Sequence, residues 1–186
     1  TVLIAYRDRT ADEIRDISII RRHNGVWSGP VNVHADGWEI SGCPVNGPAI
    51  DAQATNAVVA WFTGADNIAT IKVAFSEDSG VTFGPTFPVD SGESVGRVGT
   101  LMLATGDALI SWVEWTSDGE MLILCRATKN DGCVARQTIT EHAAAGSFNF
   151  PKLARSGDKI YLAWTQPIDS KAVFSTIRMV AFDLSD

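Results

Sequence analysis

The sequence predicts an all-β fold made of about three and a half four-stranded blades of a six-bladed β-propeller. A short apolar strand that ends in a small residue and an aromatic one occurs four times, at Tyr6, Trp61, Trp112 and Trp164, and these aromatics are 55, 51 and 52 residues apart. That period is close to the ~40–50 residues of a propeller blade. No stretch has the 3.6-residue apolar period of an amphipathic helix, so every element is expected to be a strand.

Each repeat has the same order of strands, which we letter A to D from the axis outward. An apolar segment marked by Gly or Pro comes first, then a polar turn, the aromatic-tipped strand, a third strand and a weaker outer strand. The first repeat lacks strand A and the last lacks strand D. The predicted strands span residues 2–8, 14–22, 27–33, 47–50, 58–61, 69–75, 86–89, 96–103, 109–112, 121–127, 134–140, 150–154, 160–164 and 173–182. The corresponding blades are 1–40, 41–91, 92–142 and 143–186.

A β-sandwich of about fourteen short strands is the alternative, because its strands are spaced at a similar ~8–12 residues. The regular period favours the propeller. An open arc of blades exposes sheet faces and edges that proteins normally cover. Further blades or a second copy of the chain are therefore expected to close it. Because Thr1 is not an initiator methionine and an apolar strand follows it directly, we expect a piece of a longer chain.

The segment 76–83 fits the hairpin-turn pattern S-x-D-x-G-x-T-[FW], known as the Asp-box. Asp78 is expected to accept hydrogen bonds from the turn's own N–H groups, with the hydroxyls of Ser76 and Thr82 as further partners. Gly80 can adopt the positive φ that such a turn needs, and Phe83 can bury its ring beneath it. A polar hairpin that matches the pattern by chance is the alternative. In either case the segment supports the fold and carries no chemistry.

Composition indicates one domain, residues 1–186, with 45% apolar and 20% charged residues, as is ordinary for a globular protein. The 15 basic and 22 acidic residues give a net charge of −7, which argues against nucleic acid or an anionic membrane as a partner. No apolar run approaches the roughly 18 residues of a membrane-spanning helix.

Cysteine and histidine positions predict little chemistry. His23, His34 and His142 have no metal-ligand spacing, so neither a metal nor a cofactor is expected. Cys125 and Cys133 flank a polar turn and can face each other across a hairpin. Either they form a disulfide, which indicates an oxidising compartment and leaves Cys43 unpaired, or all three remain thiols.

The Asp-box, the blade period and the segments 7–9, 14–17, 36–40 and 42–48 together resemble the C-terminal part of bacterial sialidase-like (BNR/Asp-box repeat) propellers. The resemblance implies a glycoside hydrolase that acts on glycans with an acidic sugar, in a secreted, periplasmic or cell-surface setting. Asp-boxes also occur in propellers with other functions. The alternatives are therefore a non-catalytic module that binds a glycan or another ligand, and a structural or protein-interaction module.

Blade topology separates two faces of the molecule. The D–A connections and B–C hairpins open on one, the loop face, whereas the A–B and C–D turns with the Asp-box lie on the other, the turn face, away from any central pocket. Register places Arg97 and Lys152 at equivalent positions of successive inner strands, near the axis. The polar and aromatic residues expected on the loop face are Arg7, Asp8, Arg9, Asp12, Trp38, Glu39, Cys43, Asn46, Asp66, Glu93, Ser94, Arg97, Glu114, Trp115, Asp118, Asn149, Lys152, Gln166 and Asp169.

Sialidases hold the substrate carboxylate with three arginines and use an Asp as acid/base and a Tyr, polarised by a Glu, as nucleophile; bidentate guanidinium groups fit a planar carboxylate. By this resemblance Arg97 is one candidate arginine, with Arg7 or Arg9 as another. Glu114 or Glu39 is a candidate to polarise a nucleophile. The full set of catalytic candidates is Arg97, Arg7, Arg9, Asp8 and Glu114, and that of ligand-binding candidates is Trp38, Glu39, Asn46, Trp115 and Lys152.

Structural alternatives accompany these candidates. The charged residues of 7–16 also fit a ladder of cross-strand ion pairs, and the loop carboxylates also fit a solvated surface. Tyr6 and Tyr161 lie on strands where core packing is favoured. A complete sialidase site cannot be assembled from this chain alone.

Overall fold

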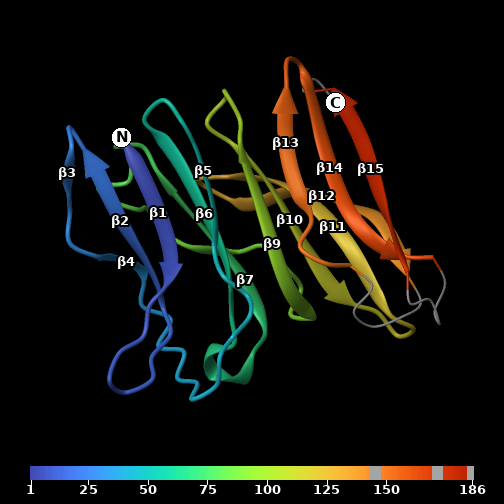
Figure 1. The fold of residues 1–186 in the computed structure, drawn as a ribbon, viewed down its shortest axis with the longest axis horizontal. Helices are drawn as coiled ribbons and strands as arrows, with labels where there is room; N and C mark the ends of the chain where they lie inside the picture. The colour runs from blue at the N-terminus through green and yellow to red at the C-terminus, as the bar shows by residue number, and fades with distance from the viewer. Residues whose placement is uncertain (143–147, 169–173, 184–186) are drawn as a thin grey trace.

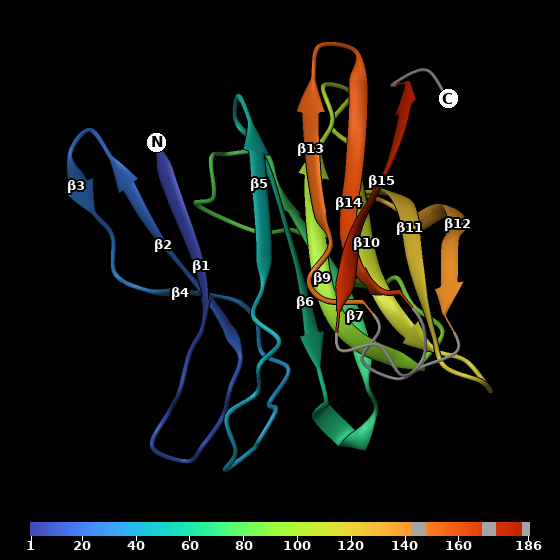
Figure 2. The same cartoon turned by 45° about the vertical axis from the view of Figure 1, so that its right-hand side comes forward.

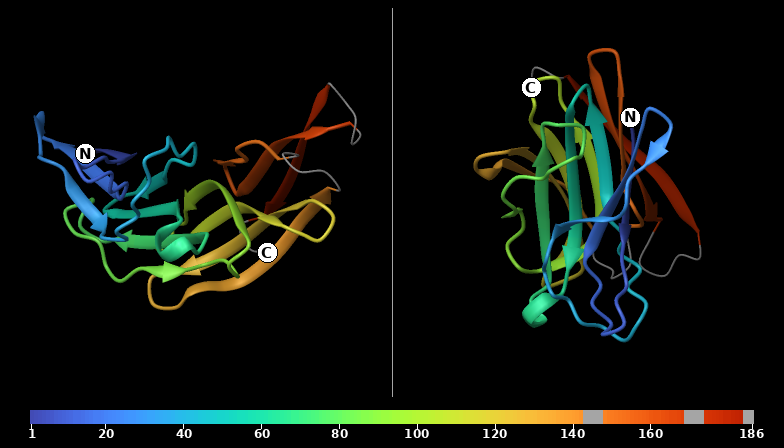
Figure 3. Two further views of the ribbon diagram at one scale, coloured as in Figure 1. Left: turned by 90° about the horizontal axis from the view of Figure 1, so that it is seen from below. Right: turned by 90° about the vertical axis from the view of Figure 1, so that its left-hand side faces the viewer.

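In the computed structural model, which describes residues 1–142, 148–168 and 174–183, the chain forms four antiparallel β-sheets. The sheets follow one another in chain order across the molecule (Figure 1). Seen from below, they fan out as an open arc (Figure 3). This is the arrangement of successive propeller blades, so the predicted all-β, partial-propeller fold is confirmed.

The first sheet is three strands wide. Its strands are β1 (Val2–Arg7), β2 (Ile17–His23), β3 (Val26–Trp27) and β4 (Val31–His34). Both β3 and β4 pair with β2, so they share the outer position, while β1 pairs with the other side of β2. The sheet therefore has strands B, C and D and no strand A, as the sequence predicts.

The other sheets follow the predicted order from the axis outward. The second contains β5 (Ala49–Gln53), β6 (Asn56–Thr63), β7 (Thr70–Ser76) and β8 (Phe87–Pro88), with the short 3-10 helix η1 (Ala65–Asn67) between β6 and β7. The third contains β9 (Ser94–Met102), β10 (Ala108–Trp115), β11 (Glu120–Thr128) and β12 (Gly132–His142). The fourth contains β13 (Lys152–Ser156), β14 (Lys159–Pro167) and β15 (Ser175–Asp183).

Apolar side chains fill the spaces between successive sheets. Trp61 and Trp112, two of the aromatics that define the sequence period, are fully buried. Trp61 packs with Ile17 and Ile19 of the first sheet, and Trp112 belongs to the cluster between the second and third. A third cluster joins the third sheet to the fourth. Because side chains alternate across a strand, each inner sheet contributes to two of these clusters.

The inner strands β5, β9 and β13 lie side by side, nearest the concave side of the arc (Figures 2 and 3). A disulfide between Cys125 and Cys133, whose Cα atoms are 5.9 Å apart, closes the hairpin between β11 and β12. Of the two alternatives left open by the sequence, the structure therefore has the disulfide. Cys43 is free and exposed.

Candidate functional site

Arg7 ends β1 on the loop face, and its guanidinium is partly buried. It donates to the carbonyl oxygens of Asn46 at 2.9 and 3.2 Å, Arg15 at 2.6 Å and Phe62 at 2.6 Å. Its carbon Cζ lies 4.8 Å from the ring centre of Trp38. Burial lowers the pKa of Arg7 to about 10, against the opposing effect of nearby carboxylates. The guanidinium therefore ties the first sheet to the second, with donors on all three nitrogens in use.

Asn46 carries the connection on to the third sheet. Its Oδ1 accepts the backbone N–H of Arg97 at 3.0 Å, and its Nδ2 donates to the carbonyl of Val95 at 2.9 Å. Between these residues Gly96 has a φ of +99°, and any Cβ there would overlap the Asn46 side chain. The side chain of Asn46 thus holds the start of β9 in an irregular conformation that includes a positive φ, 58°, at Arg97.

The guanidinium of Arg97 binds none of the groups that Arg7 binds. Its Nη1 donates to the carbonyl of Phe148 and to Oε2 of the fully buried Glu120, the latter at 3.2 Å. Glu120 Oε2 also accepts the N–H of Phe148 at 3.3 Å. Nε and Nη2 of Arg97 have no partner among the described residues. The two predicted arginines are therefore linked through Asn46 but do not converge on one point.

Arg9 lies on the exposed loop after β1 and pairs with Glu13, which also binds Arg15 at 2.8 Å. Hydrogen bonds from these two arginines lower the pKa of Glu13. Asp8 accepts the N–H of Arg9 at 2.8 Å and the hydroxyl of Ser18 at 3.1 Å. Arg9 and Arg15 thus form ion pairs as in the structural alternative, but both pair with Glu13 inside the loop between β1 and β2, so the expected cross-strand ladder is not formed.

Glu114 is fully buried at the loop end of β10. Its Oε1 accepts the indole N–H of Trp112 at 2.7 Å, and its Oε2 pairs with Arg136 of β12. Nearby, Asp90 accepts the hydroxyl of Ser94, and burial raises its pKa. Sequence reasoning missed Asp90 and Arg136, because only the pairing of β12 with β11 brings Arg136 to this place.

The aromatic candidates differ in how much of their surface is open. Trp38 lies between Arg7 and Phe62, whose ring centre is 5.6 Å from its own. Trp115 is exposed at the end of β10. Glu39 is exposed, and its backbone bridges to Ile14. Trp115 and Glu39 are therefore accessible to a ligand, whereas the ring of Trp38 is already in contact with Arg7 and Phe62.

A hollow of about 270 Å³ lies between the inner strands near the loop face. Lys152 of β13 lines it, is exposed, and forms no ion pair within the described residues. Thr100 of β9 also lines it, with a buried Oγ1 that has no partner in that part of the chain. The remaining lining residues are Gly47, Pro48, Ala49, Ile50, Val98, Gly99, Phe150, Pro151 and Leu153. The residues that line this axial hollow are thus mostly apolar in type, with one lysine and one threonine among them; Tyr6 and Tyr161 are not part of it.

On the turn face, the segment 76–83 forms the hydrogen bonds expected from its sequence. Asp78 accepts the N–H groups of Val81 and Thr82 at 3.0 and 2.9 Å and the hydroxyls of Ser76 and Thr82 at 2.8 and 2.6 Å. These bonds, led by those from Thr82, lower the pKa of Asp78 to about 2. Gly80 has a φ of +77°, and Phe83 packs beneath the turn against the core cluster between the first and second sheets.

Three further observations concern residues 1–142, 148–168 and 174–183. No cluster of three His, Cys, Asp or Glu side chains suited to a metal ion occurs among them. No helix there is long and apolar enough to cross a membrane. Asp169, which the sequence places on the loop face, lies outside these ranges.

No protein-family model and no curated protein matches this chain. Solved structures of glycoside hydrolases do. An α-L-arabinofuranosidase from Clostridium thermocellum has 13% identity and a TM-score of 0.51, over 94% of this chain and 60% of that one. The NanB sialidase from Streptococcus pneumoniae has 12% identity and a TM-score of 0.54, over 91% of this chain and 28% of its own. The α-L-arabinofuranosidase PaAbf62A from Podospora anserina has 10% identity and a TM-score of 0.51, over 96% and 68%.

These similarities establish the class of fold: the chain has part of a β-propeller of the kind found in glycoside hydrolases. At identities of 10–13% they show the fold alone. Since arabinofuranosidases stand beside a sialidase among the similar structures, the resemblance extends to glycoside-hydrolase propellers in general rather than to sialidases in particular. The chain spans 60% of the length of the Clostridium enzyme.

Proposed function

We propose that this chain is part of a glycan-acting β-propeller of the glycoside-hydrolase kind, with the axial hollow as its sugar-binding site. The observation that carries the proposal is the hollow at the propeller axis, whose lining includes Lys152, an exposed lysine without an ion pair among the described residues, and Thr100. Apolar walls with a few convergent polar groups are typical of small-molecule sites. The similarity of the fold to the propellers of an arabinofuranosidase and a sialidase also supports a function in glycan binding or cleavage.

The finer proposal is that the sugar is acidic. In a protein of net charge −7, a cation at the axis favours an anionic group locally. Arg97 is the second group we assign to this role; it is not among the lining residues, but it lies next to Val98 at the start of β9, and its Nε and Nη2 have no partner in the described chain. Arg7 instead positions the loop that carries Asn46, since its donors already bind carbonyl groups.

The alternative, a propeller that binds a glycan without cleaving it, is favoured by a specific observation. Neither Tyr6 nor Tyr161 lines the hollow, so neither is placed to act there as a nucleophile. We further propose an extracellular or periplasmic setting, including the cell surface, because the Cys125–Cys133 disulfide persists in oxidising surroundings.

Calorimetric titration with sialyllactose and with a neutral arabino-oligosaccharide tests the proposal, alongside hydrolysis of a chromogenic sialoside and arabinofuranoside on the same samples. Lys152→Ala is expected to weaken binding of sialyllactose roughly tenfold or more, as for loss of a charge-assisted bond, and to leave the neutral sugar unaffected. Lys159→Ala is the matched control, a lysine of the same sheet beside Asp183 at the turn face. Binding without hydrolysis selects the non-catalytic alternative, and absence of any binding overturns the proposal.

A further inference from the structure

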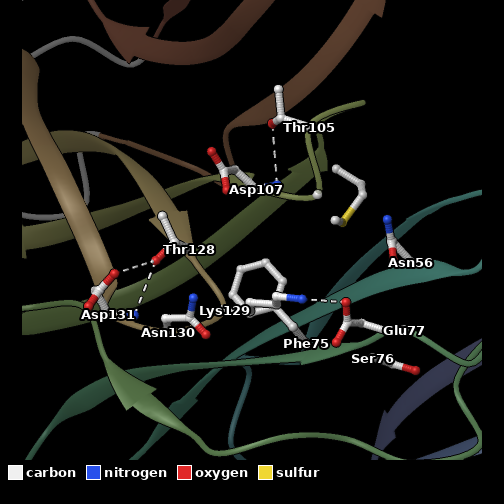
Figure 4. A pocket seen from close by; sticks show the side chains of 12 residues that line it. Asn56, Phe75, Ser76, Glu77, Thr105, Asp107, Thr128, Lys129, Asn130 and Asp131 are labelled. Atoms are coloured by element: carbon white, nitrogen blue, oxygen red, sulfur yellow. Dashed lines mark hydrogen bonds and ion pairs between the residues drawn. The ribbon is translucent and has the colours of Figure 1, made fainter.

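A second hollow, also of about 270 Å³, lies on the turn face between the second and third sheets (Figure 4). Four segments line it: the β5–β6 turn, the end of β7, the β9–β10 turn and the β11–β12 hairpin. It is distinct from the axial hollow, and the two share no lining residue. We call it the turn-face pocket.

The walls of the turn-face pocket are held by their own bonds. In the β11–β12 hairpin, the hydroxyl of Thr128 accepts the N–H of Asp131 at 3.1 Å, and the Cys125–Cys133 disulfide closes the hairpin behind it. In the β9–β10 turn, Asp107 accepts from Arg126 at 2.8 Å. Since these segments are braced without a ligand, little ordering cost is left for binding.

Polar groups of both kinds are displayed around the pocket. The side-chain amides of Asn56 and Asn130 make no hydrogen bond within the described residues, and each offers a donor and an acceptor. Lys129 pairs with Glu77 across the pocket, as Figure 4 shows. The side chains of this pair are 48% and 66% exposed, and ion pairs so exposed contribute little stability, so either partner can exchange it for a ligand.

The charges and the size of the pocket narrow the ligand class. The carboxylates of Glu77, Asp107 and Asp131 outnumber the one lysine of the lining, which disfavours an anion. A simple cation needs acceptors only, whereas this rim mixes amide and ammonium donors with amide and carboxylate acceptors. Hydroxyl groups both donate and accept. The volume, about 270 Å³, lies just below the roughly 300–1,000 Å³ of typical small-ligand pockets, and suits one ring rather than a chain of them.

We infer that the turn-face pocket binds a single neutral sugar ring, with the amides of Asn56 and Asn130 bonding its hydroxyl groups. Phe75, at the centre of the lining in Figure 4, provides an apolar floor. This site is independent of the axial hollow and would give the propeller a second contact with a glycan on the opposite face. Its existence does not depend on the proposed function.

Backbone-amide NMR of the 186-residue chain, titrated separately with methyl glycosides of glucose, mannose, galactose and arabinose, tests the inference. At least one glycoside is expected to shift the amides of residues 105–107 and 128–131 together while those of 98–100 stay in place. Asn130→Ala, at an exposed hairpin position, should raise the dissociation constant about tenfold, as for loss of one or two hydrogen bonds. Asn32→Ala, an exposed asparagine on β4, should leave it unchanged.

Two further outcomes distinguish sugar binding in the turn-face pocket from binding at the axial hollow and from binding of a cation. Glycoside-induced shifts at residues 98–100 in place of those at 105–107 and 128–131 would assign the binding to the axial hollow and overturn the inference. Methylammonium chloride is the probe for a cation site. If it moves the same amides and no glycoside does, or if no probe moves them, the inference is wrong.

Discussion

Asn46 connects the first sheet to the third on the loop face, and its hydrogen bonds are expected to stabilise the fold. Its side chain makes two hydrogen bonds to the backbone of β9, and its carbonyl accepts Arg7. Asn46→Ala leaves the Arg97 N–H and the Val95 carbonyl without these partners, so we expect the free energy of unfolding to fall by about 2 kcal/mol. Urea denaturation measures it, with Asn32→Ala as the exposed control; equal midpoints for the two variants would contradict this role.

The carboxylate of Asp78 is expected to make the stability of the folded protein depend on pH in a way that can be assigned to this one residue. Its pKa is about 2 in the folded protein, below the ordinary 3.8, because the turn's own groups bond the charged form. Because the pKa is lower in the folded than in the unfolded protein, Asp78 stabilises the fold at pH values above its unfolded pKa. That contribution is lost as the pH falls from about 4 to about 2. Thermal unfolding followed over this range should therefore depend less on pH in Asp78→Asn. Parallel profiles for the variant and the parent would exclude Asp78 as the source.

At the scale of elements, the turn 76–83 connects the second sheet to the first. Gly80 has a φ of +77°, and a Cβ there would lie 2.6 Å from Leu3 of β1. Gly80→Ala combines backbone strain with overpacking, so we expect a loss of about 2–4 kcal/mol in unfolding free energy. Gly84→Ala is the matched control, because Gly84 has an ordinary φ and its Cβ would lie 3.6 Å from the Phe75 carbonyl. A similar loss in both variants would show that neither strain nor overpacking at Gly80 is the cause.

The β11–β12 hairpin is the element that the Cys125–Cys133 disulfide stabilises. The bond joins cysteines 8 residues apart, and closing so short a loop in the unfolded chain corresponds to about 2–3 kcal/mol in the chain-entropy model. The double variant Cys125→Ala with Cys133→Ala should lose about that much stability in guanidinium denaturation. Cys43→Ala, at the exposed free thiol, should lose none. If a reducing agent lowers the parent's stability but leaves the double variant unchanged, the effect belongs to the disulfide.

For the whole molecule, the ~52-residue period predicts the sheets because each repeat contains the same aromatic-tipped strand, whose aromatic is buried in the second, third and fourth sheets. The carbonyl partners of Arg7 and Arg97 are harder to predict, since a backbone carbonyl has no side-chain signature. The sequence spacing of the contacting residues nevertheless carries information about these contacts. Asn46 and Arg97 are 51 residues apart, as are Arg97 and Phe148, so equivalent positions of neighbouring blades meet. The turn-face pocket shows the same spacing, with 52 residues between Glu77 and Lys129.

The outward faces of the first and fourth sheets remain uncovered in the described chain. On β15, Ile177 and Met179 are 76% and 61% exposed, and on β1 Val2 and Ile4 are 51% and 42% exposed. Their neighbours on each strand point to the core, so these apolar residues share the outer face of their sheet. Contiguous apolar surface of this kind marks an interface. We propose that further blades or a second copy of the chain covers it.

The isolated chain is therefore expected to self-associate and to bind a hydrophobic dye. Ile177→Ser with Met179→Ser should lower both the mass measured by light scattering and the dye fluorescence, because it removes apolar area without touching the core. Val45→Ser with Ile68→Ser is the matched control, since these residues are equally exposed but lie on separate loops. A parent chain that is a monodisperse monomer without dye binding would show that the outer faces need no cover. The arc of blades would then be stable as it stands.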